Sequence, residues 1–251
     1  MPNPAVLSTV VSELFPRGVV AAELRTPGDA SLLYPEEAQS VARAVPKRVG
    51  EFAAGRLCAR RALAEFGITN FPVRMAADRA PIWPDAMVGS ITHTRGYCVA
   101  AVGERRIFSA LGLDLEVAGD VKKDLWGHIC VPAELSWLAS LPVAAQAPAA
   151  TLMFSAKEAF YKCQYPVTAQ LLQFGDLCIT LPDFHPDDHG LGAFLVAPTR
   201  SIAVSARSET RFRGMYWTRD GYVAAAVCFP VEESSISPPE PESKRSTPAR
   251  D

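Results

Sequence analysis

Apolar positions follow two different periods along this chain, and each period predicts one type of element. Side chains of a strand alternate between two faces, whereas apolar residues three and four apart line one face of a helix. The pattern predicts strands over residues 88–94, 96–102, 111–116, 177–181, 193–197, 211–218 and 222–229. It predicts helices over residues 49–63, 121–130, 132–141 and 151–165, the last of which is ended by Pro166.

Other stretches carry no clear period. Residues 1–30 contain four prolines that break any long element, and the alanine- and proline-rich stretch 141–150 predicts a loop. Residues 185–190 hold two histidines and two aspartates, but their turn-forming composition favours an exposed connection over a metal site. Serine, proline, glutamate and lysine dominate from residue 232 onward, which predicts a disordered tail over 232–251.

An internal repeat runs through the predicted elements. Gly96–Val102 matches Gly221–Val227 at five positions of seven, and Phe52–Arg60 shares an aromatic start and a basic end with Phe154–Lys162. The order of a helix followed by strands therefore occurs twice. The sequence predicts an α+β fold of two similar α/β lobes, residues 1–108 and 109–231, each with antiparallel strands packed on helices. A cleft between the lobes is the expected ligand site.

Composition and charge narrow the class of protein. The chain has 251 residues, 49% of them hydrophobic and 21% charged, and a formal net charge of −2. That balance gives no general reason to expect nucleic acid or an anionic membrane as a partner. Apolar runs stay well short of the roughly 20 residues that a membrane helix needs. The six cysteines form no Cys-x-x-Cys pair, so we expect reduced thiols in a cytoplasmic protein.

The first candidate for chemistry is the predicted strand Leu111–Glu116. Its alternation places Asp114 and Glu116 on one face, while Leu113 and Leu115 face the core. Two neighbouring carboxylates in a partly desolvated position ionise together only beside a cation. A hard divalent ion such as Mg²⁺ suits such oxygen ligands.

The second candidate lies on the predicted helix over 151–165. Glu158 and Lys162 are four residues apart and so share one helical face, which supplies a third carboxylate and an ammonium able to bind phosphate. Each of the two motifs has an ordinary alternative. An Asp-x-Glu strand is commonly a solvated face, and a Glu/Lys pair four apart is commonly a surface ion pair.

Together and in this order, Gly112–Glu116 and Phe154–Lys162 resemble the signature of the 4'-phosphopantetheinyl transferases. That signature is a Gly-(Ile/Leu/Val)-Asp-x-Glu strand followed by (Trp/Phe)-Ser-x-Lys-Glu-(Ala/Ser)-x-x-Lys, and both stretches match at every defined position. Gly89–His93 resembles the Gly-Ser-Ile-(Ser/Thr)-His motif of the family. Lys47–Arg56 and Arg79-Ala80-Pro81 are similar to the enterobactin-synthetase branch, as is Phe154 where many relatives have Trp.

The resemblance implies a role for each motif. Mg²⁺ would be held by Asp114, Glu116 and Glu158. Coenzyme A would be bound at its 3'-phosphate and adenine end by Arg48, Arg56, Arg79, Thr92 and His93, and at its pyrophosphate by Lys157 and Lys162. Glu158 and Lys162 would be the catalytic pair, although Glu158 as a metal ligand conflicts with Glu158 as the base for the attacking hydroxyl.

The implied reaction transfers the 4'-phosphopantetheine arm of coenzyme A to a serine of an apo carrier protein and releases 3',5'-ADP. Acyl, peptidyl and aryl carrier domains all remain possible partners, in fatty-acid, polyketide, nonribosomal-peptide or siderophore pathways. Two alternatives stay open: a Mg²⁺-dependent phosphohydrolase, and a non-catalytic module that binds coenzyme A or a carrier protein. A cleft formed within one chain leads us to expect a monomer.

Overall fold

The computed structural model describes residues 5–182, 184, 190–202 and 211–231. The predicted tail over 232–251 and the connection over 185–189 lie outside these residues. Within the described residues, the helices are too short or too polar to cross a membrane. All six cysteines are free thiols.

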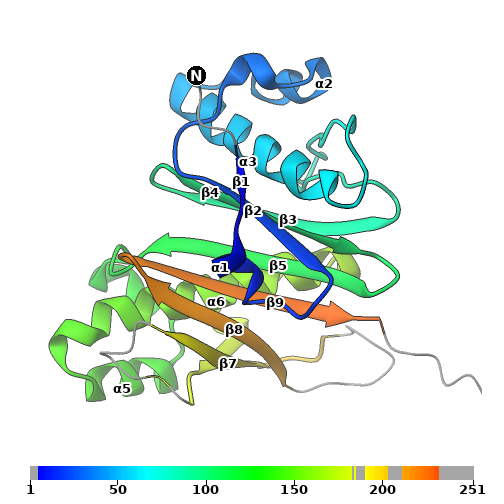
Figure 1. The fold of residues 1–251 in the computed structure, drawn as a ribbon. Helices are drawn as coiled ribbons and strands as arrows, with labels where there is room; N and C mark the ends of the chain where they lie inside the picture. The colour runs from blue at the N-terminus through cyan, green and yellow to red at the C-terminus, as the bar shows by residue number, and fades with distance from the viewer. Residues whose placement is uncertain (1–4, 183, 185–189, 203–210, 232–251) are drawn as a thin grey trace, which may run out of the picture.

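The first half of the chain forms a four-stranded antiparallel sheet in the order β1-β2-β4-β3. Helix α3 lies along one face of this sheet (Figure 1). The short helices α1 and α2 and two 3₁₀ turns, at 30–32 and 39–41, complete this half. The bounds are β1 Val6–Leu7, α1 Thr9–Ser12, β2 Val19–Leu24, α2 Pro35–Ala38, α3 Pro46–Ala64, β3 Met87–Thr94 and β4 Tyr97–Glu104.

The second half forms a five-stranded antiparallel sheet in the order β5-β9-β8-β7-β6. Its long helix α6 packs on β5 and β9, and α5 lies near the far end of the sheet (Figure 1). The bounds are β5 Phe108–Val117, α4 Trp126–Ile129, α5 Pro132–Ser140, α6 Val143–Thr168, β6 Leu177–Thr180, β7 Leu191–Pro198, β8 Phe212–Arg219 and β9 Tyr222–Pro230, with 3₁₀ turns at 123–125 and 174–176.

Three apolar clusters hold these layers together. One lies between α3 and the first sheet, a second between the two sheets, and a third between the second sheet and α6. Each sheet thus buries one face on a helix and the other on its neighbouring sheet, which is the usual way for such elements to hide their apolar sides. The predicted α+β class, with antiparallel strands packed on helices, is confirmed.

The two sheets meet along β3 and β5, which form no backbone ladder with each other. A side chain makes the connection instead, because the backbone N–H of Leu113 donates to the hydroxyl of Ser90 at 3.1 Å. The predicted strands that carry the family motifs therefore lie side by side. This junction is where the candidate site is built.

Two predictions about elements are wrong. Strand β2 lies within the supposedly irregular residues 1–30; its prolines flank the strand at positions 16 and 27, and Ala21, Ala22 and Leu24 are buried. Helix α6 begins at Val143 and contains both Pro148 and Pro166. A proline removes one helical hydrogen bond, and burial of Ala145, Ala149 and Ala150 supports the extra turns around Pro148.

Candidate functional site

Gly112 sets the distance between strand β5 and helix α6. A Cβ at this position would lie 1.9 Å from the carbonyl oxygen of Ala159 and 2.7 Å from the backbone nitrogen of Cys163. Only glycine lets the helix backbone rest directly on the strand. This contact brings the carboxylates of β5 next to Glu158 and Lys162 on α6.

Asp114 is the most buried member of this group, at 3% exposure, and its neighbours Leu113 and Leu115 are fully buried. Lys162 Nζ lies 2.6 Å from Asp114 Oδ1 and donates to the carbonyl oxygen of Leu113 at 3.3 Å. The Lys162 side chain keeps 30% exposure. The prediction that the two leucines face the core is confirmed, and the ion pair places one ammonium beside the carboxylates.

Negative charge is in excess at this position. Burial, together with the charge of Asp114, raises the pKa of Glu116 to about 7. Burial also raises the pKa of Glu158, against the opposing effect of Lys162. Burial acts to lower the pKa of Lys162, but the three surrounding carboxylates raise it overall. One ammonium therefore faces three carboxyl groups, an arrangement that attracts a further cation.

The residues present fit a hard divalent cation in donor type. Asp114 Oδ2 is buried and has no hydrogen-bond partner among the described residues, so its lone pairs are available. Carboxylate oxygens are the ligands that Mg²⁺ prefers. In the described parts of the chain, three acidic, histidine or cysteine side chains are nowhere grouped tightly enough to hold a metal as they stand. Binding would thus require these side chains to move together.

Arg48 and His93 come from the first half of the chain. Arg48 Nη1 donates to His93 Nε2 at 2.9 Å and lies 3.8 Å from Glu51. Burial lowers the pKa of His93; Arg48 and Lys162 lower it further, whereas Glu51 and Asp114 oppose them. His93 therefore interacts electrostatically with Asp114 and Lys162. The neutral ring accepts the Arg48 proton donor.

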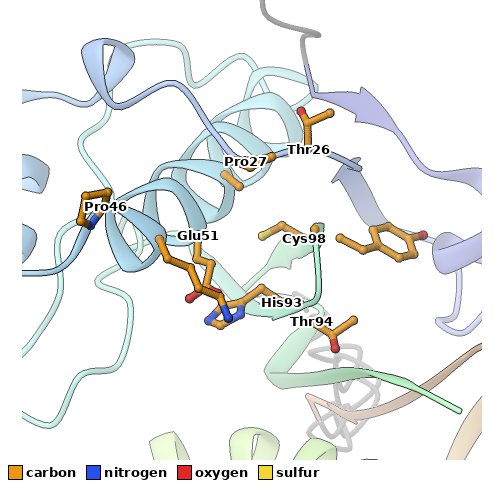
Figure 2. Close-up of a pocket in the computed structure, with 11 residues that line it drawn as sticks. Thr26, Pro27, Pro46, Glu51, His93, Thr94 and Cys98 are labelled. Carbon is orange, nitrogen blue, oxygen red and sulfur yellow. The ribbon is translucent and has the colours of Figure 1, made fainter. Parts of the chain in front are cut away.

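A cavity of about 260 Å³ opens beside His93. Figure 2 shows its walls, which come from α3, from the loop at Thr26 and Pro27, and from the hairpin that joins β3 to β4. The cavity is lined by Thr26, Pro27, Pro46, Lys47, Glu51, Ala54, His93, Thr94, Gly96, Tyr97 and Cys98. His93 thus lines this cavity and also interacts electrostatically with Asp114 and Lys162.

The other two predicted arginines differ from Arg48. Arg56 is 7% exposed, donates to the carbonyl oxygen of Val73 at 2.9 Å, and stacks 3.7 Å above the ring of Phe52. Burial lowers its pKa to about 10. Arg79 is exposed in a tight turn at φ 73°. In the described structure, neither arginine makes a direct hydrogen bond to Lys162 or to the carboxylates around it.

Lys157 takes no part in the site. Its ammonium is fully buried and donates to Glu134 Oε2 at 2.7 Å, to the carbonyl oxygen of Ile129 at 2.7 Å, and to that of Phe174 at 3.1 Å. This placement corrects the prediction that Lys157 contacts phosphate. Lys157 and Lys162 are five positions apart, which rotates the two side chains about 140° from each other on the helix. The spacing could have revealed this difference.

Sequence reasoning missed two hydroxyl contacts to these carboxylates. The hydroxyl of Thr94 donates to Glu116 Oε2 at 3.4 Å. The hydroxyl of Thr92 donates to Asp114 Oδ1 at 3.2 Å, and its contact with coenzyme A stays a prediction. Ser90, Thr92 and Thr94 occupy alternate positions of β3 and so share one face of the strand. This alternation of hydroxyls is the sequence signal that could have predicted the two contacts.

Both halves of the chain match known protein families. The family "4'-phosphopantetheinyl transferase N-terminal domain" matches residues 36–103, and the "4'-phosphopantetheinyl transferase superfamily" matches residues 110–227. The chain is similar to 4'-phosphopantetheinyl transferase Svp of Streptomyces mobaraensis, with 38% identity over 224 residues, 87% of this chain and 88% of that protein.

Two further relatives show how far the similarity extends. 4'-Phosphopantetheinyl transferase PptT of Mycobacterium tuberculosis is 34% identical over 231 residues, covering 88% of this chain and 98% of that protein. Enterobactin synthase component D of Escherichia coli is 37% identical over 118 residues, 46% of this chain and 54% of that protein. The chain therefore belongs to the 4'-phosphopantetheinyl transferase family, whose enzymes move the phosphopantetheine arm of coenzyme A to a carrier protein.

Proposed function

We propose that this chain performs the transfer at the junction of β3, β5 and α6, using coenzyme A and a serine of an apo acyl, peptidyl or aryl carrier domain. One observation carries the proposal: Asp114 Oδ2 is buried and has no hydrogen-bond partner in the part of the chain that the structure describes, while Lys162 contacts the other oxygen of this carboxylate at 2.6 Å. An ammonium and an unsatisfied carboxylate are suited to meet a phosphate and its cation.

Asp114, Glu116 and Glu158 would hold Mg²⁺. Support comes from the three carboxyl groups that share a single ammonium, and from the raised pKa values of Glu116 and Glu158. The ion, when bound, would neutralise charge on the pyrophosphate of coenzyme A. Without the ion, burial disfavours the ionised forms of these two half-buried glutamates.

Lys162 would bind the phosphate at which the bond breaks. A lysine ammonium has three donors, and two of them are used on Asp114 and on the carbonyl oxygen of Leu113. The third remains for a phosphate oxygen. A donor held in place before the reaction stabilises negative charge that develops on the leaving group.

Arg48 and His93 would bind the nucleotide end of coenzyme A. They are joined at 2.9 Å, and Arg48 keeps 37% side-chain exposure. A phosphate arriving at this pair would gain a charge-assisted hydrogen bond from the guanidinium. Arg56 on α3 would contribute a second guanidinium to this end of coenzyme A, and Arg79 would approach from the loop whose Asp78 helps to raise the pKa of Tyr161 on α6.

Glu158 is our candidate for the base that takes the serine proton. Burial raises the pKa of this carboxyl, and a base with a raised pKa accepts a proton more readily at neutral pH. The same group is also among the proposed ligands of the ion. Its half-buried position leaves room for either a direct role or one through a water.

The two halves would form similar lobes, residues 1–108 and 109–231, with the site in a cleft between them. Support comes from the repeated Gly-Tyr turns, because Tyr97 and Tyr222 meet edge to face with ring centroids 5.2 Å apart. Since both halves of one chain supply site residues, a monomer suffices. The six free thiols suit a reducing, cytoplasmic compartment.

Intact-mass spectrometry of apo carrier domains incubated with this protein, coenzyme A and Mg²⁺ tests the proposal. We expect a mass gain of one phosphopantetheine on at least one carrier type, lost with EDTA and lost in Glu158→Gln. Glu65→Gln, on the exposed end of α3, is the matched control and keeps the activity. Cleavage of coenzyme A without a modified carrier would point to a phosphohydrolase, and binding without turnover to a non-catalytic module.

A further inference from the structure

We propose that Thr92 and Thr94 are positioning residues for the carboxylates of β5, each holding one oxygen so that the other stays open. The inference rests on the proposed function, in which Asp114 and Glu116 hold the ion. It concerns residues that neither touch coenzyme A nor bind the metal in this account. It also gives Thr92 a different task from the nucleotide contact expected of it.

The junction of β3 and β5 is built from side-chain hydroxyls. Ser90, Thr92 and Thr94 alternate along β3 and therefore point to the same face. Ser90 accepts the N–H of Leu113 at 3.1 Å, Thr92 donates to Asp114 at 3.2 Å, and Thr94 donates to Glu116 at 3.4 Å. Each of these three hydroxyls thus forms a hydrogen bond with a successive polar group of β5.

The two oxygens of Asp114 have opposite surroundings. Oδ1 accepts from both the Thr92 hydroxyl and the Lys162 ammonium, at 3.2 and 2.6 Å. Oδ2 is buried and has no hydrogen-bond partner among the described residues. A buried carboxylate oxygen without a partner costs free energy unless a ligand satisfies it. Two donors on Oδ1 therefore fix the rotation of the carboxylate and leave Oδ2 free for a cation.

Glu116 repeats this arrangement less firmly. Its Oε2 accepts from Thr94 at 3.4 Å, a longer bond than that of Thr92, and the side chain is half-buried. We therefore expect Thr94 to orient its carboxylate more weakly than Thr92 does.

Hydroxyls in this position act through the ligands that they orient. Partners that hydrogen-bond to ligating carboxylates commonly change metal affinity by about 10- to 100-fold when they are removed. Valine has nearly the shape of threonine but lacks the hydroxyl, so it removes the hydrogen bond and keeps the packing of a buried strand. Serine restores the hydroxyl without the methyl group.

The experiment measures Mn²⁺ binding by electron paramagnetic resonance, with no coenzyme A present, because Mn²⁺ accepts the same oxygen ligands as Mg²⁺. We expect Thr92→Val to weaken Mn²⁺ binding by about 10-fold and Thr92→Ser to stay close to wild type. Coenzyme A binding, measured by calorimetry in EDTA, should be the same in all three proteins. Thr94→Val should weaken Mn²⁺ binding less than Thr92→Val does.

Unchanged Mn²⁺ affinity in Thr92→Val would overturn the inference. Weaker coenzyme A binding in EDTA, with Mn²⁺ binding intact, would likewise overturn it and return Thr92 to the nucleotide site. If Thr92→Val does not fold, Thr94→Val at its half-buried position decides the question by the same readout. If the wild-type protein modifies a carrier but binds no Mn²⁺, the proposed metal site is wrong. If the wild-type protein modifies no carrier, the proposed function is wrong.

Discussion

Helix α6 carries two lysine–carboxylate pairs of almost equal length that differ in burial and in hydrogen bonding. Lys157 meets Glu134 at 2.7 Å, and Lys162 meets Asp114 at 2.6 Å. In the first pair both side chains are buried and every atom is satisfied, since Glu134 also accepts the backbone N–H groups of Val131 and Ile179. In the second pair the lysine is 30% exposed and Asp114 Oδ2 has no partner among the described residues.

The length of an ion pair therefore does not distinguish a structural pair from a functional one. What distinguishes them is whether their hydrogen bonds are complete. A buried pair whose lone pairs and protons are all used has none left for a ligand, so its role is structural. An unsatisfied pair that faces further carboxylates is prepared for a ligand. Lys157 and Lys162 differ in this respect although the family motif names both.

The first half of the chain contains its own counterpart of the satisfied pair. Glu37 is fully buried, pairs with Arg60 of α3, and accepts the N–H groups of Tyr34 and Val73. Like Glu134, it is the third residue of a short helix that begins with proline. These contacts equate Arg60 with Lys157, not with Lys162 as the sequence repeat suggested. Both halves thus contain a buried, fully hydrogen-bonded ion pair of this kind, and within the described residues the candidate carboxylates Asp114, Glu116 and Glu158 belong to the second half.

The largest effect is expected for Lys157→Met, which leaves the buried carboxylate of Glu134 without its counter-charge. Breaking a buried pair on one side costs about 3–5 kcal/mol, a large share of the usual folding stability of about 5–15 kcal/mol. Urea unfolding followed by circular dichroism measures the loss. A loss below about 1 kcal/mol would contradict the view that this pair supports the fold.

Lys162→Met is the matched substitution on the same helix. The Lys162 side chain keeps 30% exposure, so water weakens this pair and we expect a smaller loss of unfolding stability than in Lys157→Met. Turnover should fall by about 100-fold, as is typical when one charge-stabilising donor is lost. Steady-state kinetics with an apo carrier, beside calorimetry of coenzyme A binding, separates the two effects. A loss confined to coenzyme A affinity would make Lys162 a binding residue only.

Much of the fold follows from local pattern. The alternation in Leu111–Glu116 placed Leu113 and Leu115 in the core, and the turn at Asp220-Gly221 has the positive φ angles, 53° and 77°, that a tight hairpin requires. Strand β2 escaped prediction because the prolines of residues 1–30 were taken to break every element there, whereas Pro16 and Pro27 lie outside the strand.

The arrangement of the candidate site was predictable where its side chains share one helical face or one strand face. Asp114, Glu158 and Lys162 were brought together by such spacing, with Gly112 closing the distance. Lys157 was misplaced because the motif was read as a string and not as a helix surface. The partners that make it structural, Ile129 and Phe174, come from segments whose arrangement only the fold reveals.

A smaller effect of opposite sign is expected for Glu116→Gln in protein kept in EDTA. Glu116 is held beside Asp114, and both burial and that neighbouring charge disfavour its ionised form. The neutral amide relieves the repulsion, so the metal-free variant should be more stable than wild type, by about 1 kcal/mol. Thermal unfolding with and without Mg²⁺ provides the measurement. A variant less stable than wild type in EDTA would mean that Glu116 supports the fold as Glu134 does.

The smallest effect is expected for Arg61→Ala, which removes a third pair of the same length. Arg61 lies 2.6 Å from Glu65 on α3, but the two side chains are 38% and 40% exposed. Water screens exposed pairs, and pairs four residues apart on a helix are worth about 0.3–0.5 kcal/mol. Unfolding in urea should therefore detect little change, and turnover should equal that of wild type. A loss as large as that in Lys157→Met would show that distance, and not burial with full satisfaction, determines what these pairs contribute.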